Sequence, residues 1–523
     1  MKLRTRLALL TAAVTGRRAG PRMLARYAGA EHQRIVARWF TELEEPNEEL
    51  RNTLRELRAR SRQLMRDNGE AAGLAFDFEA DIVGAAGARL QFRARTPRGA
   101  LREPLNERVE AAWTQWGRRE TCTASGHLTW PALQRLALRT VIVDGEFLAL
   151  KEMDPRLPYG FRLQPLDADQ LDETYTFDRL PNGNAVMMGV ETDRFGRPVA
   201  YWIWDRHPSM PGRIRQRIEA ARVLHMFKAL RPGQLRGVPW FAPALVTWKL
   251  GQRYTEAELY QSMLAAAQGG FFVNRDGGGF DIPTDEQGNP IPLVMEAEPG
   301  SARVLPGGYE FQAWEPKHPT ANYVGFMKVV KRTVARAFGR SYASLTGDLS
   351  DVNFSSMRTD RVREIEQNRM HQQDLLVDQL CVPVFADWAR MATLTGALGT
   401  VPVDSEGMTR FATWQCKGWP WIDPLKDVTA SQLQLNMGIT SPQRLCSEQG
   451  RDYFEVIDEI AEAQAYAAAK GVNLQPVPLQ MTVNADAEAE PATGTPSPAE
   501  EQQAREAGPS RFLRTLTQRT TAA

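Results

Sequence analysis

The sequence predicts an α+β protein built from several domains. The chain has 523 residues, of which 43 % are hydrophobic and 24 % are charged, a composition that allows several sizeable cores. Residues 131–240 alternate short apolar runs with turns, which is typical of mixed helices and strands. Residues 354–395 form one helical pattern interrupted only by Pro383, and a helix of that length spans roughly 60 Å. Because an interior proline removes a backbone hydrogen bond, we expect a kink there.

The bulk composition excludes several classes of protein. A net charge of +1 argues against a nucleic-acid coat, although a local basic stripe remains compatible with it. The four cysteines are far apart and form no CxxC, so we expect reduced thiols without a disulfide framework or a zinc site. The apolar run at 7–14 is short and is followed at once by two arginines, so we expect no secretory signal. No stretch approaches the ~20 apolar residues of a membrane span.

The α/β body contains a predicted hairpin. Leu133, Leu136 and Ala137 lie on a helix, and residues 141–143 form a β-branched run that predicts a strand. An Asp-Gly pair follows and predicts a turn, and residues 147–150 predict the second strand.

The rest of the chain is segmented by helical periodicity and by Gly and Pro. Helices are expected at 243–268 and 323–340, and two more within 429–471, with a Gly/Pro-rich insert at 276–320 and a loop at 341–353. From about 472 the composition predicts a disordered tail. Residues 1–38 carry nine Lys/Arg and one acid. We interpret them as a solvated arm, and the alternative is contact with nucleic acid or an acidic partner.

No known catalytic constellation is found. The sequence lacks a phosphate-binding P-loop, HExxH and GxSxG, and its six histidines are scattered singly. Asp167, Asp169 and Asp172 form the one dense acidic cluster of the body. They could hold a divalent cation in a metal-dependent nucleic-acid-processing enzyme. They also suit turn and N-cap positions, which is the interpretation we favour. We therefore expect no catalytic residue, no metal and no cofactor.

The helix 323–340 carries a basic stripe. Lys328, Arg332, Arg336 and Arg340 recur at four-residue steps with Lys331 beside them, and this helix holds no acid. A solvated helix face is the ordinary explanation of such a pattern. Repeated around a ring, the stripe would instead make a positive lining that follows a phosphate backbone without reading bases.

The insert that precedes this helix has the opposite charge. Residues 276–300 contain no Lys or Arg. Their acids predict a surface that docks a protein partner, or simply a soluble loop. Those proposed for docking are Asp281, Asp285, Glu286, Glu296 and Glu298.

One segment carries a family resemblance. Residues 338–358, FGRSYASLTGDLSDVNFSSMR, resemble the signature of lambda-family portal proteins of tailed bacteriophages. Further blocks are similar to that family in the same order. They are LALRTVIVDGE at 136–146, PLDADQLD at 165–172, GVETDRFGRPV at 189–199, RPGQLRGVPWFAPA at 231–244 and WPWIDP at 419–424. The resemblance covers roughly residues 50–470.

The resemblance implies the portal-protein fold, with an α/β wing, a helical stem that carries a small clip insert, a long kinked helix and a helical crown. The implied parts are a basic N-terminal arm at 1–49, the first part of the wing at 50–242, stem helices at 243–275 and 321–340, a clip at 276–320, a tunnel loop at 341–353, a long wing helix at 354–396, a wing return at 397–428, a crown at 429–471 and a disordered tail at 472–523.

The resemblance also implies a function. Portal subunits form a ring, usually a dodecamer, at one capsid vertex of the virion, and DNA enters and leaves the head through it. The implied partners are other copies of this chain, double-stranded DNA, the terminase large subunit, head-completion and connector proteins, and capsid and scaffold proteins, with no membrane. Assembly would occur in the host cytoplasm. The implied tunnel-loop residues are Leu345, Thr346, Gly347, Asp348 and Leu349. A different minor head or scaffold protein is the structural alternative.

Overall fold

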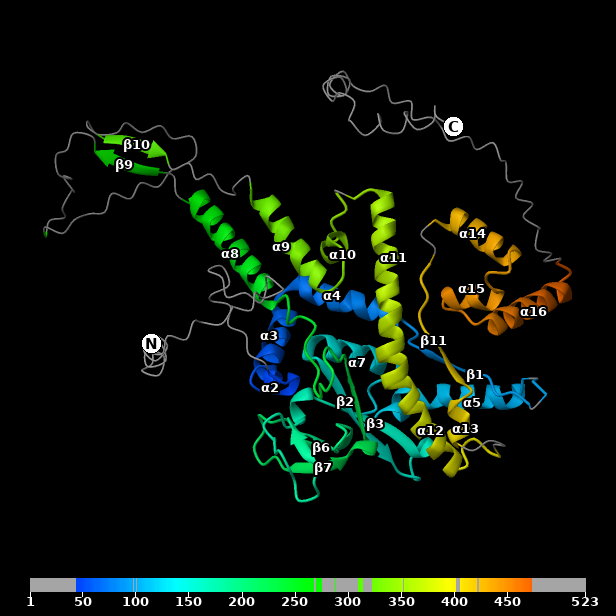
Figure 1. Ribbon diagram of the computed structural model, residues 1–523. Helices are drawn as coiled ribbons and strands as arrows, with labels where there is room; N and C mark the ends of the chain where they lie inside the picture. The colour runs from blue at the N-terminus through cyan, green and yellow to red at the C-terminus, as the bar shows by residue number, and fades with distance from the viewer. Residues whose placement is uncertain are drawn as a thin grey trace, which may run out of the picture. The chain divides into compact units, whose positions relative to one another are not determined.

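The computed structural model describes residues 44–96, 98–99, 101–267, 270–274, 287, 309–313, 322–350, 352–400, 405–420 and 423–472. The expectations for the basic arm up to residue 43, for the five acidic docking residues of 276–300 and for the tail from 473 lie outside these residues. The chain divides into two compact units, one that ends at Phe454 and one that begins at Glu455. The first unit contains the α/β body, the helix pair and the long helix (Figure 1).

The body begins with a run of helices, α2 (Pro46–Arg51), α3 (Leu54–Asp67) and α4 (Gly69–Phe78). On α3, Leu54, Arg58, Ser61 and Leu64 are buried, which is the spacing of a single helix face. Asn68 ends α3 and caps α4, because its side chain accepts a hydrogen bond from the Ala71 N–H at 3.0 Å. A π-helical turn, η2 (Glu79–Val83), completes α4.

The predicted hairpin around residue 145 is wrong, because residues 141–143 are helical. They belong to α7 (Trp130–Asp144), which Thr129 caps at its start. Val141 and Ile142 are buried on the same helix as Leu133 and Ala137, so tertiary burial overrides their β propensity. Gly145 has a φ of 93° and ends the helix in the left-handed conformation. It is therefore a helix C-cap and not the turn of a hairpin.

Two antiparallel sheets follow. In the first, β2 (Glu146–Met153) lies between β3 (Phe161–Leu166) and β8 (Val223–Phe227), with Leu148 opposite both Leu166 and His225. The second is a meander. Its strands are β4 (Ala185–Met187), β5 (Val190–Thr192), β6 (Pro198–Trp204) and β7 (Arg215–Glu219), and the short 3₁₀ helices η3 (Pro158–Gly160), η4 (Ala168–Gln170) and η5 (Ala220–Arg222) connect the strands of the two sheets.

A third pairing joins distant parts of the chain. Strand β1 (Arg89–Phe92) pairs antiparallel with β11 (Ala412–Gln415). Between β1 and α7 lie α5 (Glu103–Trp116) and α6 (Arg119–Cys122). The body core beneath them is aromatic, and Trp113 packs edge-on against Trp130, Phe385 and Trp388 at ring distances of 5.1–5.6 Å.

An antiparallel helix pair extends from the body (Figure 1). Helix α8 (Leu245–Ala267) and helix α9 (Tyr323–Ala337) pack on one another. The insert between them contains a two-stranded hairpin of β9 (Gly270–Asn274) and β10 (Tyr309–Ala313), with Phe272 opposite Phe311. A short helix, α10 (Tyr342–Thr346), follows α9.

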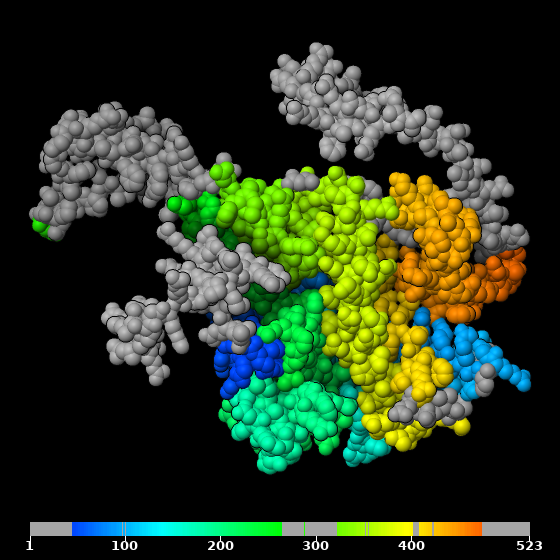
Figure 2. Space-filling view, viewed as in Figure 1, coloured from blue at the N-terminus to red at the C-terminus, as the bar shows by residue number. Residues whose placement is uncertain are grey.

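The long helix predicted at 354–395 is confirmed as one helical run with a change in its middle. It consists of α11 (Phe354–His371), a π-helical segment η6 (Gln372–Cys381) and α12 (Val382–Leu394). Pro383 stands directly after the π segment. The helix changes direction in this region (Figure 1), in accordance with the expected kink, and the π-helical hydrogen bonds accommodate the missing N–H of the proline. In the space-filling view the long helix forms a continuous yellow ridge on one face (Figure 2).

The remaining elements are helical. They are α13 (Ser405–Thr409), α14 (Pro424–Asn436), α15 (Pro442–Glu448) and α16 (Tyr453–Ala469). The segment 429–471, for which two helices are expected, thus holds parts of three. The α+β class predicted for the chain is confirmed. Among the helices that the structure describes, none combines the length and the apolar character that a membrane span requires.

Candidate functional site

The predicted basic stripe lies on α9. Helix α9 packs on α8, and this packing fixes the direction in which its side chains point. Gly251 allows the close approach, because a Cβ there would lie 3.0 Å from Val330 Cγ1. Farther along, the Tyr323 hydroxyl donates a hydrogen bond to Thr255 Oγ1 at 3.2 Å, and Tyr254 stacks on Tyr323 with ring centroids 5.7 Å apart. One face of α9 thus packs against α8.

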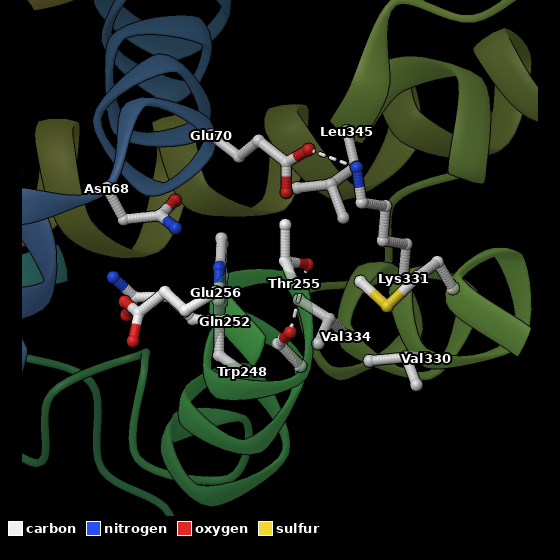
Figure 3. A pocket seen from close by; sticks show the side chains of 12 residues that line it. Asn68, Glu70, Trp248, Gln252, Thr255, Glu256, Val330, Lys331, Val334 and Leu345 are labelled. Carbon is white, nitrogen blue, oxygen red and sulfur yellow. Dashed lines mark hydrogen bonds and ion pairs between the residues drawn. The ribbon is translucent and has the colours of Figure 1, made fainter. Parts of the chain in front are cut away.

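A cavity of about 260 Å³ lies at the base of the pair, between α4, α8, α9 and α10 (Figure 3). Apolar side chains that include Trp248, Val334 and Leu345 line it. At its edge the Lys331 ammonium forms an ion pair with the Glu70 carboxylate, as Figure 3 shows. Lys331 therefore ties α9 to the start of α4, and its charge is locally balanced.

The opposite face of α9 carries the exposed cations. Arg332 and Arg336 are exposed and Lys328 is half-buried, and their spacing of four residues places them on one stripe. Within the described part of the chain, no carboxylate lies within ion-pair distance of Arg332 or Arg336. The Arg332 guanidinium lies over the Tyr342 ring, 5.7 Å from its centroid. On this face Arg332 and Arg336 therefore present positive charge that no described carboxylate pairs with.

Arg340 does not belong to that stripe, which corrects the sequence-based expectation. Helix α9 ends at Ala337, and Gly339 has a φ of 69°, so the four-residue period stops before Arg340. The side chain turns inward and is 4 % exposed. Its guanidinium lies 3.2 Å from Asp81, 3.4 Å from Glu364 and 4.2 Å from the centroid of the Phe78 ring. Arg340 thus joins α9 to α4 and α11.

The predicted tunnel-loop residues divide between a helix and a turn. Leu345 and Thr346 lie on α10, and Leu345 is buried in the body core. Gly347 ends α10 with a φ of 71°. Leu349 is 57 % exposed.

Asp348 is held by local hydrogen bonds. Hydrogen bonds from Ser350 lower the pKa of this carboxyl, and the Tyr342 hydroxyl and the nearby Lys328 charge lower it further. The Tyr342 hydroxyl donates to Asp348 Oδ2 at 3.2 Å. Asp348 is therefore an ionised turn residue that connects back to α10.

The acidic cluster of the body is an ion-pair network. Asp167 caps η4 by accepting from the Asp169 N–H at 2.9 Å. Asp169 contacts Arg58 at 2.8 Å and Arg62 at 2.7 Å. Burial would raise the pKa of the Asp169 carboxyl, but Arg58 and Arg62 outweigh the burial and lower it. Asp167 and Asp169 have ligand atoms within 4.8 Å of one another and of His207, yet arginines already contact both carboxylates.

The third aspartate points elsewhere. Asp172 is 3 % exposed and pairs with Arg215 at 2.7 Å. It also accepts hydrogen bonds from the backbone N–H and the hydroxyl of Thr174. The structure therefore does not bring the three predicted carboxylates together, which favours the turn and N-cap interpretation.

A buried charge cluster around Glu146 was missed at the level of sequence. Glu146 is 0 % exposed and lies 2.8 Å from Arg58, 2.9 Å from Arg236 Nε and 3.1 Å from His225 Nε2. Burial would raise the pKa of Glu146, but the Arg236 charge and hydrogen bonds from His225 and Arg236 hold it well below its usual value. The signal was present in two blocks, DGE at 144–146 and RG at 236–237.

The two glycines of those blocks explain the pattern. A Cβ on Gly237 would lie 2.0 Å from the Gly145 carbonyl oxygen, and one on Gly145 would lie 2.6 Å from the backbone of Val238. Only glycine fits such a backbone crossing. The crossing places the Gly237 N–H 3.0 Å from Glu146 Oε2. These two blocks therefore build the body.

Comparison with known proteins identifies the family. The model of the lambda family of phage portal proteins matches residues 32–372. The chain is 31 % identical over 416 residues to the probable portal protein of Halomonas phage phiHAP-1, covering 78 % of this chain and 79 % of that protein. It is 22 % identical over 462 residues to the portal protein of Escherichia phage N15, covering 79 % and 85 %. The chain therefore belongs to the lambda family of phage portal proteins.

Solved structures with a weaker likeness come from gene transfer agent (GTA) particles. One is a chain of the neck of an empty particle computed with C6 symmetry, with 17 % identity, a TM-score of 0.42, and coverage of 75 % of this chain and 93 % of that one. Another is a chain of the neck of a native particle computed with C12 symmetry, with 16 % identity, a TM-score of 0.41 and the same coverage.

Proposed function

We propose that this protein forms a ring at one vertex of a phage head, and that double-stranded DNA is packaged and ejected through the ring. In this proposal the subunit does no covalent chemistry. The terminase large subunit supplies the packaging motor, and head-completion and connector proteins, the capsid and the scaffold are its other partners. Assembly takes place in the host cytoplasm.

The observation that carries the proposal is the pair of exposed arginines on the outer face of α9. The outer face of α9 presents Arg332 and Arg336, exposed and without carboxylate partners among the described residues. Cations on one face, repeated in each subunit of a ring, attract the phosphate backbone at any sequence. Because such contacts do not read bases, they permit DNA to move.

The outer face of α8 exposes large apolar side chains, with Lys249 and Arg253 among them. Val246, Leu250 and Tyr260 recur at helical spacing on the side away from α9 and are 70 %, 60 % and 68 % exposed. On α11, Met357, Val362 and Met370 are also exposed. Exposed apolar side chains that gather on one helix face can mark a protein–protein interface. We infer that these faces are covered by neighbouring subunits, because a ring needs an interface with two different surfaces on each copy.

The parts of the chain receive the following proposed roles. The body at 50–242 and the return segment at 397–428 form the wing, α8 and α9 form the stem, and the insert at 276–320 forms the clip. Residues 341–353 form the tunnel loop, 354–396 the long wing helix and 429–471 the crown. In the clip, Asp281, Asp285, Glu286, Glu296 and Glu298 remain proposed docking residues for the motor and connector proteins. The DNA-facing set is Lys328, Arg332 and Arg336, with Lys331 held by Glu70.

Charge reversal tests the DNA path. Arg332→Glu with Arg336→Glu is expected to reduce the yield of DNA-filled heads by on the order of tenfold, equivalent to about 1.4 kcal/mol, while negative-stain images still show rings. The matched control is Arg60→Glu with Arg156→Glu, because these side chains are 62 % and 89 % exposed on the body. If the variant with Arg332→Glu and Arg336→Glu packages DNA normally, the basic stripe is an ordinary solvated helix face.

The proposed interface between neighbouring subunits has a separate test. Leu250→Glu places a charge among the exposed apolar side chains of α8 and is expected to leave monomers that sediment without forming rings. Arg156→Glu is the control, because its side chain is 89 % exposed on the body and lies outside α8. Rings of Leu250→Glu that resemble the wild type would remove α8 from the interface.

The enzyme alternative is addressed by a magnesium-dependent cleavage assay on double- and single-stranded DNA. The arginine contacts of Asp167 and Asp169 favour no cleavage. Cleavage that is lost in Asp169→Asn would overturn the non-catalytic part of the proposal.

A further inference from the structure

One buried carboxylate of the long helix holds the start of α10. Glu364 on α11 is 1 % exposed. Its Oε1 atom accepts hydrogen bonds from the Ser341 backbone N–H at 2.9 Å and from the Ser344 hydroxyl at 2.8 Å. Ser341 is the N-cap of α10 and Ser344 lies in its first turn. Since unpaired N–H groups and partial positive charge gather there, a carboxylate is the favoured partner.

The Glu364 carboxylate is fixed from its other side as well. Arg340 and Arg361 lie 3.4 Å and 3.7 Å from Oε2. Both guanidiniums also contact Asp81 on η2, at 3.2 Å and 3.0 Å. A buried carboxylate that lost these partners would be strongly destabilised. Glu364 therefore has one stable position, which the long helix and the body define together.

The segment that follows α10 depends on α10 in turn. The Gly347 N–H donates to the Ala343 carbonyl at 2.8 Å, and the Asp348 N–H donates to Thr346 Oγ1 at 3.2 Å. Tyr342 reaches Asp348 through its hydroxyl. Each of these contacts joins residues 347–348 to α10 itself. A displacement of α10 would therefore carry these residues with it.

We propose that Glu364 is a positioning residue, which couples the place of residues 347–350 to the long helix. The inference rests on the proposed function, in which this segment belongs to the tunnel loop that narrows the DNA path. Bending or shifting of α11 moves the Glu364 carboxylate, and the start of α10 follows it through Ser341 and Ser344. The position of the loop therefore depends on the position of the long helix.

Hydrogen exchange on assembled full-length rings tests the contact. In Glu364→Gln and in the milder Ser344→Ala, the amides of residues 341–349 are expected to exchange on the order of tenfold faster. Amides of the body core should keep their wild-type rates, and rings should form normally. The matched control is Glu366→Gln, because Glu366 is 69 % exposed and pairs only with Arg369 among the ion pairs of the described residues.

Genome retention supplies the functional readout. Phage complemented with either variant should fill its heads but retain the genome in a severalfold smaller fraction of particles, while the Glu366→Gln phage behaves as wild type. Unchanged exchange at 341–349, exchange raised evenly over the body, or local loosening with normal retention would each overturn the positioning role. If the Arg332/Arg336 reversal leaves packaging normal, the proposed DNA path fails instead, and the exchange experiment still decides the Glu364 contact.

Discussion

Replacing Glu146 by glutamine should reveal how much of the body depends on one buried charge. The substitution keeps the size of the side chain and removes its charge. Arg58 and Arg236, which are 1 % and 0 % exposed, would then remain buried with less compensation. Removing one partner of a buried ion pair costs about 3–5 kcal/mol, because the other charge is left without its counter-ion.

The contacts that remain place the expected loss at the lower end of that range. Arg58 keeps Asp169 at 2.8 Å, and Arg236 keeps the Met188 carbonyl at 2.7 Å. The glutamine carbonyl still accepts one hydrogen bond, although a bond to a neutral acceptor is weaker than one to a carboxylate. We therefore expect the free energy of unfolding to fall by about 3 kcal/mol.

Urea unfolding followed by tryptophan fluorescence measures this loss, since Trp113, Trp116 and Trp388 lie in the body core. The corresponding fall in Tm is on the order of 6–12 °C for a domain of this size. Glu56→Gln is the control, because Glu56 is 62 % exposed and pairs only with Arg60 among the ion pairs of the described residues, so it should change stability by less than about 0.5 kcal/mol. A loss below about 1 kcal/mol for Glu146→Gln would refute the reasoning.

Three further predictions follow from other contacts. Gly237→Ala should abolish soluble expression or lower Tm severely, because the new Cβ would meet the Gly145 carbonyl at 2.0 Å; a soluble variant of wild-type Tm would contradict this. Burial, with the charges of Lys228 and Arg340, lowers the pKa of His371 from 6.5 to about 4. The unfolded chain therefore binds the extra proton first, so the free energy of unfolding should fall as pH is lowered from 6.5 towards 4, and His371→Phe should flatten that slope in urea titrations at each pH. Burial raises the pKa of the thiols of Cys122, Cys381 and Cys416. A thiol-reactive dye should therefore label Cys446 fastest. Mass spectrometry locates the label, and fast labelling of any of the other three thiols would contradict this.

The order of the helices could be predicted from the sequence because it depends on local signals. Helical periodicity and Gly/Pro breaks placed α8, α9 and the long helix within a few residues of their observed bounds. The strand predicted at 141–143 was wrong because an Asp-Gly pair suits both a hairpin turn and a helix end. Only burial of Val141 and Ile142 on one helix face decides between these alternatives.

The candidate site was predictable only in part, for a similar reason. The basic stripe on α9 is a local pattern, and the exposure of Arg332 and Arg336 agrees with it. Arg340 continues the same spacing in the sequence, but Gly339 breaks the helix before it. The partners of Arg340, Asp81 and Glu364, come from other segments of the chain. The residue spacing within one segment cannot predict a contact with residues from other segments.

The pairing of β1 with β11 has a consequence for synthesis. Phe92 pairs with Ala412, so β1 leaves the ribosome long before its partner strand exists, by on the order of tens of seconds at ordinary translation rates. Until then the Trp113 cluster also lacks Phe385, Trp388 and Trp414. A nascent subunit therefore exposes an open strand edge and an aromatic core. A truncated chain that lacks β11 is therefore expected to aggregate.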